Sequence, residues 1–408
     1  MSTIKTPEDF SPVLRFAVAS DAHIKAPGDE ACRLIEKMLV RSYALAGEDK
    51  AHSSLDAIIM DGDIANSAED EQFNGFFEAL ANAKKDETRF LGIIAKYHDC
   101  DKQRLTPAKF TARTGQPTDF HTVINGFHFI GISVCPAPEV FHYSDEQKAW
   151  LEREIAAAVQ DTPLLPVFVF QHEHVRDTVF GSTLFDGWGE IYFSDIFKKY
   201  SNIVNISGHS HYPAADPRAI WQGEFTALND GGLSYFEFTF DGERKYHPEN
   251  AADMAQFLLI EADNRGAVRV RTYDLHEDTV AFDHFIENAA NPAAFAYRPE
   301  NRAEKAPPPR FGEDAEIHTE RTGNGVKITV PPALTSEDDR VFLYRLVIKD
   351  KEEKTVVTDS VLSDYYYRTT PRDILFSPEL PAGKYTVFVT AESVWGKTSD
   401  ALTAGIIL

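Results

Sequence analysis

The segment Ile203-Val-Asn-Ile-Ser-Gly-His-Ser-His211 joins a short apolar run to two alternating histidines. The apolar run predicts a buried strand, and Gly208 lets the chain bend directly after it. Because residues i and i+2 of an extended or turn-like backbone point in similar directions, His209 and His211 can reach one metal ion together. Taken alone, the segment is explained about equally well as a loop that contains two unrelated polar residues.

Other apolar segments end in the same kind of residue. Six segments predict buried strands, namely Val13–Ser20, Ala57–Met60, Phe90–Ala95, Phe127–Val134, Val167–Phe170 and the segment quoted above. Five of the six are followed by aspartate, histidine or both, and the residues concerned are Asp21, His23, Asp63, His98, Asp99, His172, His209 and His211. Random placement rarely gives this coincidence, so we expect a site built from strand ends.

Segments with helical spacing of apolar side chains separate the first strands. One lies within Asp29–Ala46, and the next contains Phe73, Phe76 and Leu80. This alternation predicts βαβ units with parallel strands, whose ligands collect beyond the carboxyl ends of the strands. After the two histidines, further strands are predicted at Leu233–Phe240, Phe257–Ala262 and Ala267–Tyr273.

Composition narrows the class of protein. The 408 residues are 43% hydrophobic, which is enough for two or three soluble domains, and no apolar run approaches the length of a membrane span. Residues Met1–Pro12 are polar, unlike a signal peptide, and three cysteines cannot form a disulfide framework, so we expect a cytoplasmic protein without membrane contact. The formal charge of −23 repels polyanions, so we expect no nucleic-acid binding.

The strand-end residues form an ordered set of motifs. Asp21-Ala-His23, Gly62-Asp-Ile-Ala-Asn66, His98-Asp99, His172 and Gly208-His-Ser-His211 resemble the motifs of calcineurin-like metallophosphoesterases. The resemblance covers roughly Leu14–Tyr212, with a trailing part to about Arg302. It implies an α/β fold, a four-layer αββα sandwich that holds two divalent metal ions and hydrolyses a phosphomonoester or phosphodiester through a metal-bound water or hydroxide.

The same resemblance implies a role for each motif. One metal would be held by Asp21, His23, Asp63 and His211, and the second by Asp63, His172 and His209, with Asp63 bridging the pair. Carboxylate and imidazole ligands suit Mn, Fe or Zn. His98 would contact the phosphate or protonate the leaving alkoxide, and Asp99 would orient its ring.

Two further polar residues near the motifs have roles that the sequence leaves open. Asn66 is expected to cap a helix or to hold a water molecule near the metals. His174 lies two residues beyond His172 and is expected either to line the substrate pocket or to lie outside it.

One motif departs from the family pattern. Lys96-Tyr97 stands where the family has Gly-Asn, so the asparagine ligand of the second metal is missing. Three alternatives remain open. The second metal binds with fewer protein ligands; Lys96 or Tyr97 fills its place, leaving one metal and slow or no hydrolysis; or Tyr97 ligates a hard cation through its phenolate.

The C-terminal quarter of the chain has a different composition. We expect a phosphoesterase domain at residues 1–303, a Pro-rich linker at 304–314 and a small all-β sandwich at 315–408. The segment Leu380–Ala391 resembles a fibronectin type III strand motif, with Tyr385 as the corner tyrosine that hydrogen-bonds back to the preceding loop. Tyr365-Tyr366-Tyr367 is expected to pack internally or to contact a protein partner.

Two functions from different classes fit these observations. The first is a metal-dependent phosphoesterase acting on a small phosphate ester, with specificity in loops such as Cys100–Gln116 and Pro136–Tyr143. The alternative is a degenerate binding or interaction module with little or no turnover, since Lys96-Tyr97 replaces the Gly-Asn of the family.

Overall fold

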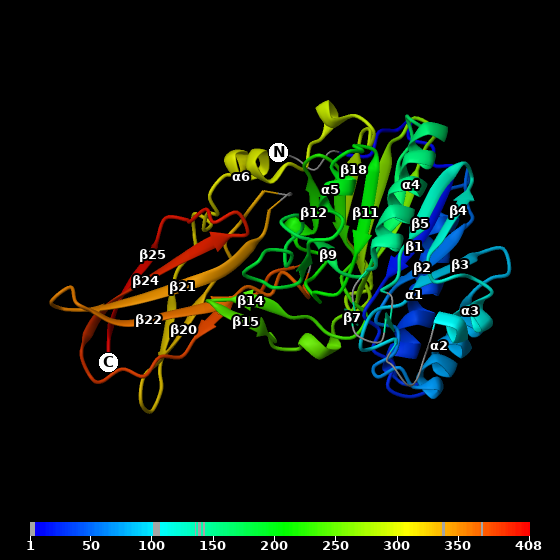
Figure 1. Cartoon of the computed structure of the whole chain (residues 1–408). Coiled ribbons are helices and arrows are strands. Elements are labelled where there is room, and N and C mark those ends of the chain that lie inside the picture. The colour runs from blue at the N-terminus through cyan, green and yellow to red at the C-terminus, as the bar shows by residue number, and fades with distance from the viewer. Residues whose placement is uncertain are drawn as a thin grey trace. The chain divides into compact units, whose positions relative to one another are not determined.

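The computed structural model describes residues 5–100, 107–134, 136–137, 140–141, 143–336, 339–368 and 370–408 (Figure 1). These residues form two compact units. The first unit comprises residues 5–239 and 244–298, and the second comprises residues 240–243 and 299–408. No helix in the described part of the chain combines the length and the apolar character that crossing a membrane requires. The predicted specificity loops lie partly outside the described residues.

The first unit contains two six-stranded sheets. One has the strand order β18-β17-β16-β1-β2-β3, with bounds β1 (Leu14–Ala19), β2 (Ala57–Asp61), β3 (Arg89–Ile93), β16 (Gln256–Ala262), β17 (Val268–Asp274) and β18 (Thr279–Ile286). Strands β1 to β3 are parallel, as the sequence predicts, whereas β16 pairs with β1 in the antiparallel direction. The strands predicted at Phe257–Ala262 and Ala267–Tyr273 are confirmed as β16 and β17, which form a hairpin with Ala262 opposite Val268.

The second sheet has the strand order β12-β13-β11-β8-β5-β4. Its bounds are β4 (Phe120–Ile124), β5 (Phe127–Gly131), β8 (Val167–Phe170), β11 (Ile203–Ser207), β12 (Ile220–Gln222) and β13 (Thr226–Asn229). Strands β5, β8, β11 and β13 are parallel, so their carboxyl ends meet at one edge.

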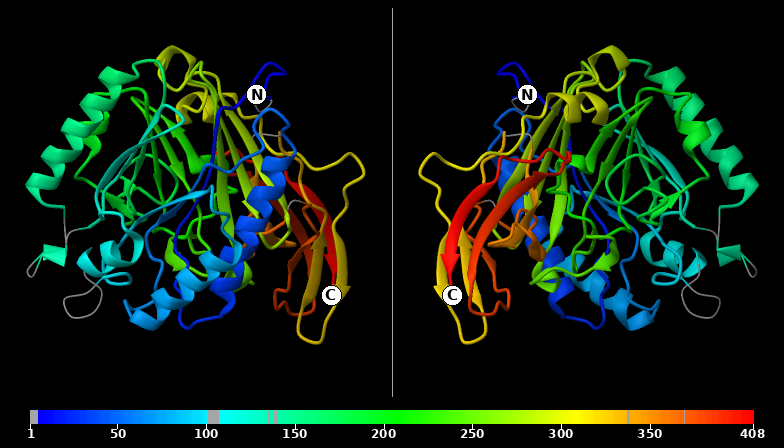
Figure 2. Two further views of the ribbon diagram at one scale, coloured as in Figure 1. Left: turned by 90° about the vertical axis from the view of Figure 1, so that its right-hand side faces the viewer. Right: turned by 90° about the vertical axis from the view of Figure 1, so that its left-hand side faces the viewer.

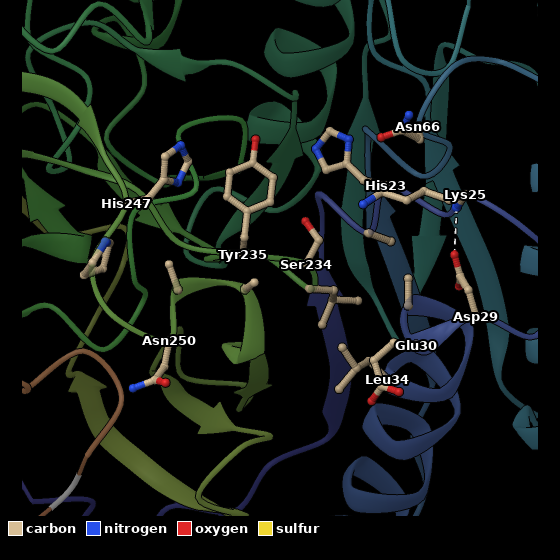
Figure 3. A pocket seen from close by; sticks show the side chains of 16 residues that line it. His23, Lys25, Asp29, Glu30, Leu34, Asn66, Ser234, Tyr235, His247 and Asn250 are labelled. Atoms are coloured by element: carbon tan, nitrogen blue, oxygen red, sulfur yellow. Dashed lines mark hydrogen bonds between the residues drawn. The ribbon is translucent and has the colours of Figure 1, made fainter.

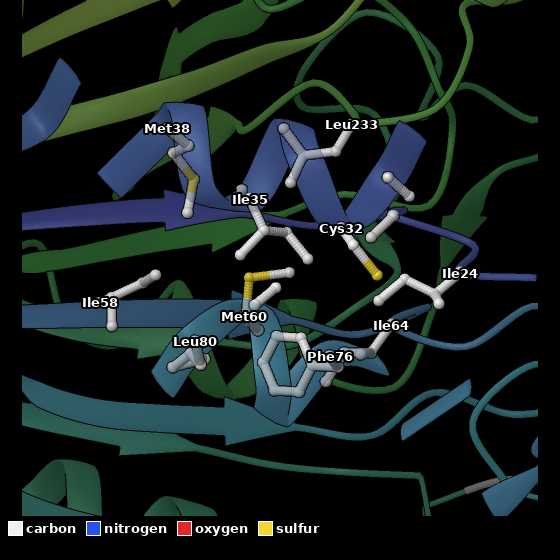
Figure 4. Close-up of a cluster of buried hydrophobic side chains, with 14 of the residues drawn as sticks. Ile24, Cys32, Ile35, Met38, Ile58, Met60, Ile64, Phe76, Leu80 and Leu233 are labelled. Atoms are coloured by element: carbon white, nitrogen blue, oxygen red, sulfur yellow. The ribbon is translucent and has the colours of Figure 1, made fainter. Parts of the chain in front are cut away.

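Helices cover the outer faces of the two sheets and complete a four-layer αββα sandwich (Figures 1 and 2). Helices α1 (Glu30–Gly47) and α2 (Asp70–Ala83) pack on the first sheet, and α4 (Asp145–Asp161) packs on the second. Figure 4 shows the α1 and α2 side chains meeting the strand side chains Ile58 and Met60. The fold class expected from the sequence is therefore confirmed.

The four layers explain why the sequences of the central strands are apolar throughout. In β1, Ala17 and Ala19 face the helices, whereas Phe16 and Val18 face the core between the sheets. Both faces of each central strand are therefore buried, and a strict alternation of apolar and polar residues is not possible. Between the sheets, Phe16 makes an edge-on contact with Phe168, with ring centroids 4.8 Å apart.

The predicted helix signals also have a physical basis in the structure. The side chain of Asp29 accepts a hydrogen bond from the Cys32 amide and caps α1, and a capping box of Ser144 and Gln147 opens α4. The remaining elements of this region are α3 (Pro107–Thr114), α5 (Ser194–Phe197), β6 (Pro136–Ala137), β7 (Val140–Phe141), β9 (His174–Val175), β10 (Gly189–Glu190), β14 (Phe238–Phe240) and β15 (Glu243–Tyr246).

One predicted strand is largely absent. Leu233–Phe240 is irregular except at β14, because its backbone amides bond to residues that follow β1 and β11 instead of to a neighbouring strand. The Leu233 amide donates to the Ser20 carbonyl, and the Glu237 amide donates to the His211 carbonyl. This segment therefore wraps around the ends of β1 and β11.

The second unit is rich in strands and carries its own core. It contains α6 (Pro299–Lys305), a sheet β19-β20-β23 and a sheet β22-β21-β24-β25, with bounds β19 (His318–Arg321), β20 (Val326–Val330), β21 (Val341–Asp350), β22 (Thr355–Leu362), β23 (Ile374–Phe376), β24 (Lys384–Ser393) and β25 (Leu402–Ile407). The Tyr385 hydroxyl donates to the Pro381 carbonyl at 3.0 Å, which is the bond back to the preceding loop that the sequence predicts. Tyr365–Tyr367 are buried, as expected of packing residues.

Candidate metal centre

The predicted metal ligands lie at the carboxyl ends of four strands from both sheets. Asp21 and His23 follow β1 and Asp63 follows β2, whereas His172 follows β8 and the two histidines of the opening segment follow β11. Asp21, His23, Asp63, His172 and His211 are buried. The structure therefore brings together residues that are far apart in the sequence.

We call Asp21, His23 and His211 the His211 half of the centre. The Nε2 atom of His211 lies 3.2 Å from Asp21 Oδ1 and 3.1 Å from the Nε2 atom of His23. His23 Nε2 is also 3.7 Å from Asp63 Oδ2. Asp21, His23 and His211 thus lie together, and Asp63 lies beside His23.

We call His172 and His209 the His172 half. His172 Nε2 lies 3.3 Å from Asp63 Oδ2 and 3.2 Å from His209 Nδ1. Asp63 therefore lies between the two halves, as expected of a bridging carboxylate. Within each half, one ligand atom per residue lies within 4.8 Å of the others.

The tautomers of the histidines leave lone pairs that point into the centre. Carbonyl oxygens only accept hydrogen bonds, so the Nδ1 atom of His211 donates to the Tyr235 carbonyl at 3.1 Å, and that of His172 donates to the Asp61 carbonyl at 2.8 Å. When these rings are neutral, each Nε2 atom carries a lone pair that is available to a metal ion. This orientation by a backbone carbonyl is the usual arrangement for a metal-binding histidine.

Unpaired carboxylate atoms support the same conclusion. Among the described residues, Asp21 Oδ1 and Asp63 Oδ1 are buried and have no hydrogen-bond partner. A buried carboxylate oxygen without a partner is costly, and coordination of a cation removes this cost. The donor set of carboxylate and imidazole therefore fits one or two divalent ions such as Mn, Fe or Zn.

The backbone of the ligands is strained. Asp21, His23, Asp63, His209 and His211 all have positive φ, between 47° and 70°. This left-handed region costs about 1 kcal/mol or more for a residue with a Cβ atom, and such strain concentrates at functional sites. The strands end abruptly here, and each side chain turns into the centre.

The two glycines of the motifs are needed for close approach. A Cβ atom on Gly62 would lie 2.6 Å from the His172 ring, and one on Gly208 would lie 2.0 Å from Ser20 Oγ and 2.7 Å from Asp21 Oδ2. Gly208 does not have positive φ, so the predicted bend is not its reason for being glycine. The reason is the packing of β11 against the end of β1.

Electrostatics favour a cation at the centre. Burial alone raises the pKa of Asp21, but His211 and His172 hold it well below its usual value. Burial likewise lowers the pKa of His172, but Asp63 and Asp21 together raise it well above its usual range. Burial lowers the pKa of His209 to about 4, so its ring is neutral at pH 7 and can coordinate a metal.

His98 lies beside the His211 half. Its ring centroid is 4.5 Å from that of His23, and its Nδ1 atom donates to the Asn66 carbonyl at 2.8 Å. The role predicted for Asp99 is corrected, because its carboxylate accepts from the backbone amides of Ala65 at 2.9 Å and of Ala95 at 3.0 Å. A buried carboxylate is satisfied by these two donors, and the Asn66 carbonyl orients the ring instead.

Asn66 does not cap a helix, since the N-cap of α2 is Glu69. The Asn66 amide donates to the Ile24 carbonyl at 3.0 Å, and its side chain lines a cavity that also contacts His23 (Figure 3). The predicted cap is therefore wrong, and Asn66 connects the cavity wall to His98.

The structure shows where Lys96 and Tyr97, the two residues that depart from the expected Gly-Asn, lie. The Lys96 ammonium lies 2.8 Å from the buried carboxylate of Glu173, the residue after His172. Burial raises the pKa of Glu173, but His209 and Lys96 lower it to about 2, so this is an ion pair at pH 7. Tyr97 has positive φ and is 62% exposed, which does not favour a phenolate ligand in the centre.

His174 is not among the residues that line the cavity beside His23. Its Nδ1 and Nε2 atoms lie 2.8 Å from Ser207 Oγ and 2.7 Å from Ser210 Oγ, and its ring is fully buried. Burial lowers the pKa of His174 to about 3. His174 therefore supports the turn that carries His209.

The sequence did not identify a second layer of carboxylates. Asp61 and Asp230 are fully buried close to the ligands, and Ser20 Oγ lies 2.7 Å from Asp230 Oδ1 and also within hydrogen-bond distance of the Asp21 carboxylate. Burial raises the pKa of Asp230 to about 8. The strand-end pattern does reach Asp230, because it follows β13, but the short segment Thr226–Asn229 is too weak a strand signal.

Tyr235 was also missed, since it lies in the irregular segment after Leu233. Its ring stacks on His211 with centroids 3.9 Å apart and planes 17° apart. Together with its carbonyl, which accepts from His211, this ring fixes the orientation of one predicted ligand.

No protein-family model matches the sequence, and no curated protein matches it. Among solved structures, a purple acid phosphatase from yellow lupin (Lupinus luteus) seeds is similar with 14% identity and a TM-score of 0.45, over 68% of this chain and 54% of that chain. Domains d3–d4 of the rat CD45 extracellular region are similar with 15% identity and a TM-score of 0.18, over 26% of this chain and 52% of that chain. The functional interpretation therefore rests on the geometry of the centre itself.

Proposed function

We propose that the chain is a calcineurin-like metallophosphoesterase that hydrolyses a small phosphomonoester or phosphodiester. The observation that carries this proposal is the convergence of Asp21, His23, Asp63 and three further histidines, His172, His209 and His211, from four strand ends. Their lone pairs and unpaired carboxylate atoms point inward. Such an arrangement is stable only with a cation, or with protons in its place.

Each half of the centre would hold one of two ions. Asp21, His23 and His211 would hold the first, His172 and His209 the second, and Asp63 would contact both. When bound, divalent ions supply positive charge for the phosphate oxygens and lower the pKa of a bound water.

His98 is the residue placed to act on the substrate. Its Nδ1–H is fixed by the Asn66 carbonyl, and its ring lies near His23 and Asp63. In the protonated ring, Nε2–H would hydrogen-bond a phosphate oxygen or protonate the leaving alkoxide. The Lys96 ammonium would add fixed positive charge beside the His172 half.

The alternative, a binding module with little or no turnover, is supported by one observation. Lys96-Tyr97 replaces the Gly-Asn of the motif that the sequence resembles, and the Lys96 ammonium is paired with Glu173, so Lys96 offers no ligand for a second cation. In that case the chain would bind a phosphate-containing ligand without cleaving it. The second unit would then serve protein contacts.

Metal analysis and kinetics test the proposal together. We expect the purified protein to bind at least one equivalent of Mn, Fe or Zn and to hydrolyse p-nitrophenyl phosphate or bis(p-nitrophenyl) phosphate. Asp63→Asn should remove both properties, whereas the exposed control Asp195→Asn should retain them. Bound metal without hydrolysis of either ester would favour the binding module, and absence of bound metal would contradict both functions.

A further inference from the structure

A cavity of about 780 Å³ opens beside the His211 half. His23 and Asn66 line it on one side, and Tyr235, His247 and Asn250 line it on the other (Figure 3). Small apolar side chains, such as Ala31 and Ala252, complete the wall. The volume is within the range of cavities that enclose organic ligands, and it exceeds what a phosphate group alone requires.

The acidic side chains of this cavity are already engaged. The Asp29 carboxylate accepts from the backbone amides of Lys25 at 2.7 Å, Ala26 at 3.2 Å and Cys32 at 3.1 Å. The Glu30 carboxylate is paired with Arg33 at 2.7 Å. Both carboxylates therefore already have hydrogen-bond or ion-pair partners, and both keep their negative charge.

Lys25 differs from these acidic groups. Its ammonium forms no ion pair and no hydrogen bond with any described residue. Figure 3 shows its side chain extending along the cavity on the side of His23. Lys25 is therefore an exposed cationic side chain of the cavity lining that is available to an anionic ligand.

We propose that the cavity binds the alcohol portion of the substrate, and that Lys25 recognises a second anionic group on it, either a carboxylate or a phosphate. This inference rests on the proposed function, because the scissile phosphate would lie at the metal centre next to His23. A charge-assisted hydrogen bond from an ammonium is the expected mode of recognition. The substrate class is therefore phosphate esters of alcohols that carry a carboxylate or a second phosphate, rather than phosphate esters of neutral alcohols.

Three aryl esters with the same ring test the proposal. The probes are phenyl phosphate, 4-carboxyphenyl phosphate and 1,4-phenylene bisphosphate, compared by kcat/KM. We expect the wild-type protein to prefer the doubly anionic esters, and the preferred one identifies the anionic group. Lys25→Gln should lower kcat/KM for the preferred ester about fivefold and leave phenyl phosphate unchanged, since an exposed ammonium contributes modestly. Lys25→Arg should restore most of the preference.

A matched control separates this effect from overall charge. Lys50 is exposed and lies outside the cavity lining. Lys50→Gln therefore removes the same charge and should leave kcat/KM unchanged for all three esters. A second variant, Ala252→Trp, reduces the cavity without removing charge and should lower kcat/KM for all three aryl esters. Equal effects of Lys25→Gln and Lys50→Gln, or no preference for the doubly anionic esters, would overturn the proposal.

The inference remains testable if hydrolysis fails. When the wild-type protein cleaves none of the esters with Mn, Fe or Zn, the phosphoesterase proposal is contradicted. Isothermal titration with the same three probes then judges the cavity alone. Tighter binding of a doubly anionic probe that is weakened about fivefold by Lys25→Gln would support the cavity proposal, and equal binding of all probes would contradict it.

Discussion

The two halves of the candidate metal centre share Asp63 but differ in what borders them. The His211 half is oriented by Tyr235 and opens onto the cavity that contains Lys25. The His172 half lies beside the ion pair of Lys96 with Glu173. The first half supplies Asp21, His23 and His211 besides the shared Asp63, whereas the second half supplies only His172 and His209 besides Asp63. We therefore expect the His211 half to bind its ion more tightly.

Replacing one histidine in each half gives the largest expected effect. His211→Ala should lower kcat/KM roughly 10³-fold and remove the tightly bound ion, because charge stabilisation and activation of water are lost together. His209→Ala should have a smaller effect on rate and remove only weakly held metal. Metal content and kinetics of both variants measure the difference. Equal losses would show that the two halves are equivalent.

His98→Gln tests the residue that faces the His211 half. We expect kcat for phenyl phosphate to fall about 100-fold, because protonation of a poor leaving group is lost. The loss for p-nitrophenyl phosphate should be smaller, since its leaving group needs little protonation. Metal content should be unchanged. An identical loss for both esters would rule out proton donation by His98.

The pH dependence of the stability of the metal-free protein tests whether buried His174 supports the turn that carries His209. His174 is neutral when folded, with a pKa of about 3, and its usual value applies when unfolded. Below that usual value the unfolded chain takes up the proton, so stability is present above about pH 6.5 and is lost as the pH falls toward 3. At pH 5 this single group should lower the free energy of unfolding by about 2 kcal/mol.

Urea denaturation in the presence of a chelator measures this effect at pH 7.5 and pH 5. His174→Gln should lose less stability between the two values than the wild-type protein does. His276→Gln, which changes an exposed histidine, should behave like the wild-type protein. The same pH dependence in all three proteins would contradict the role given to burial of His174.

The double variant Lys96→Gly/Tyr97→Asn has the smallest expected effect on rate and the sharpest effect on metal content. Removal of the ammonium and restoration of an amide ligand should add about one equivalent of metal and raise kcat/KM by about tenfold. The single variant Lys96→Met removes only the charge and should give part of the gain. No change in metal content would show that the ion pair with Glu173 does not limit the second ion.

Much of the fold was predictable because the central strands are buried on both faces. Apolar segments such as Val167–Phe170 agree with the observed strand, and the intervening helices carry apolar faces and caps. Leu233–Phe240 was predicted wrongly, because its apolar pattern gives no sign that its backbone bonds to the ends of two other strands. Local pattern cannot reveal partners that are distant in the sequence.

The sequence by itself determined which residue types end the strands, and therefore that carboxylates and imidazoles gather at one edge of the sheets. Parallel strands share the direction of their carboxyl ends, so Asp21 and Asp63 had to emerge on one side of the first sheet, and His172 and His211 on one side of the second. Only the tertiary structure decided what surrounds them. The pairing of Lys96 with Glu173, the bonds of Asp99 to two backbone amides and the open cavity at Lys25 depend on how loops from different strands pack. Side-chain partners are selected by distance in space, and distance in space is not a property of local sequence.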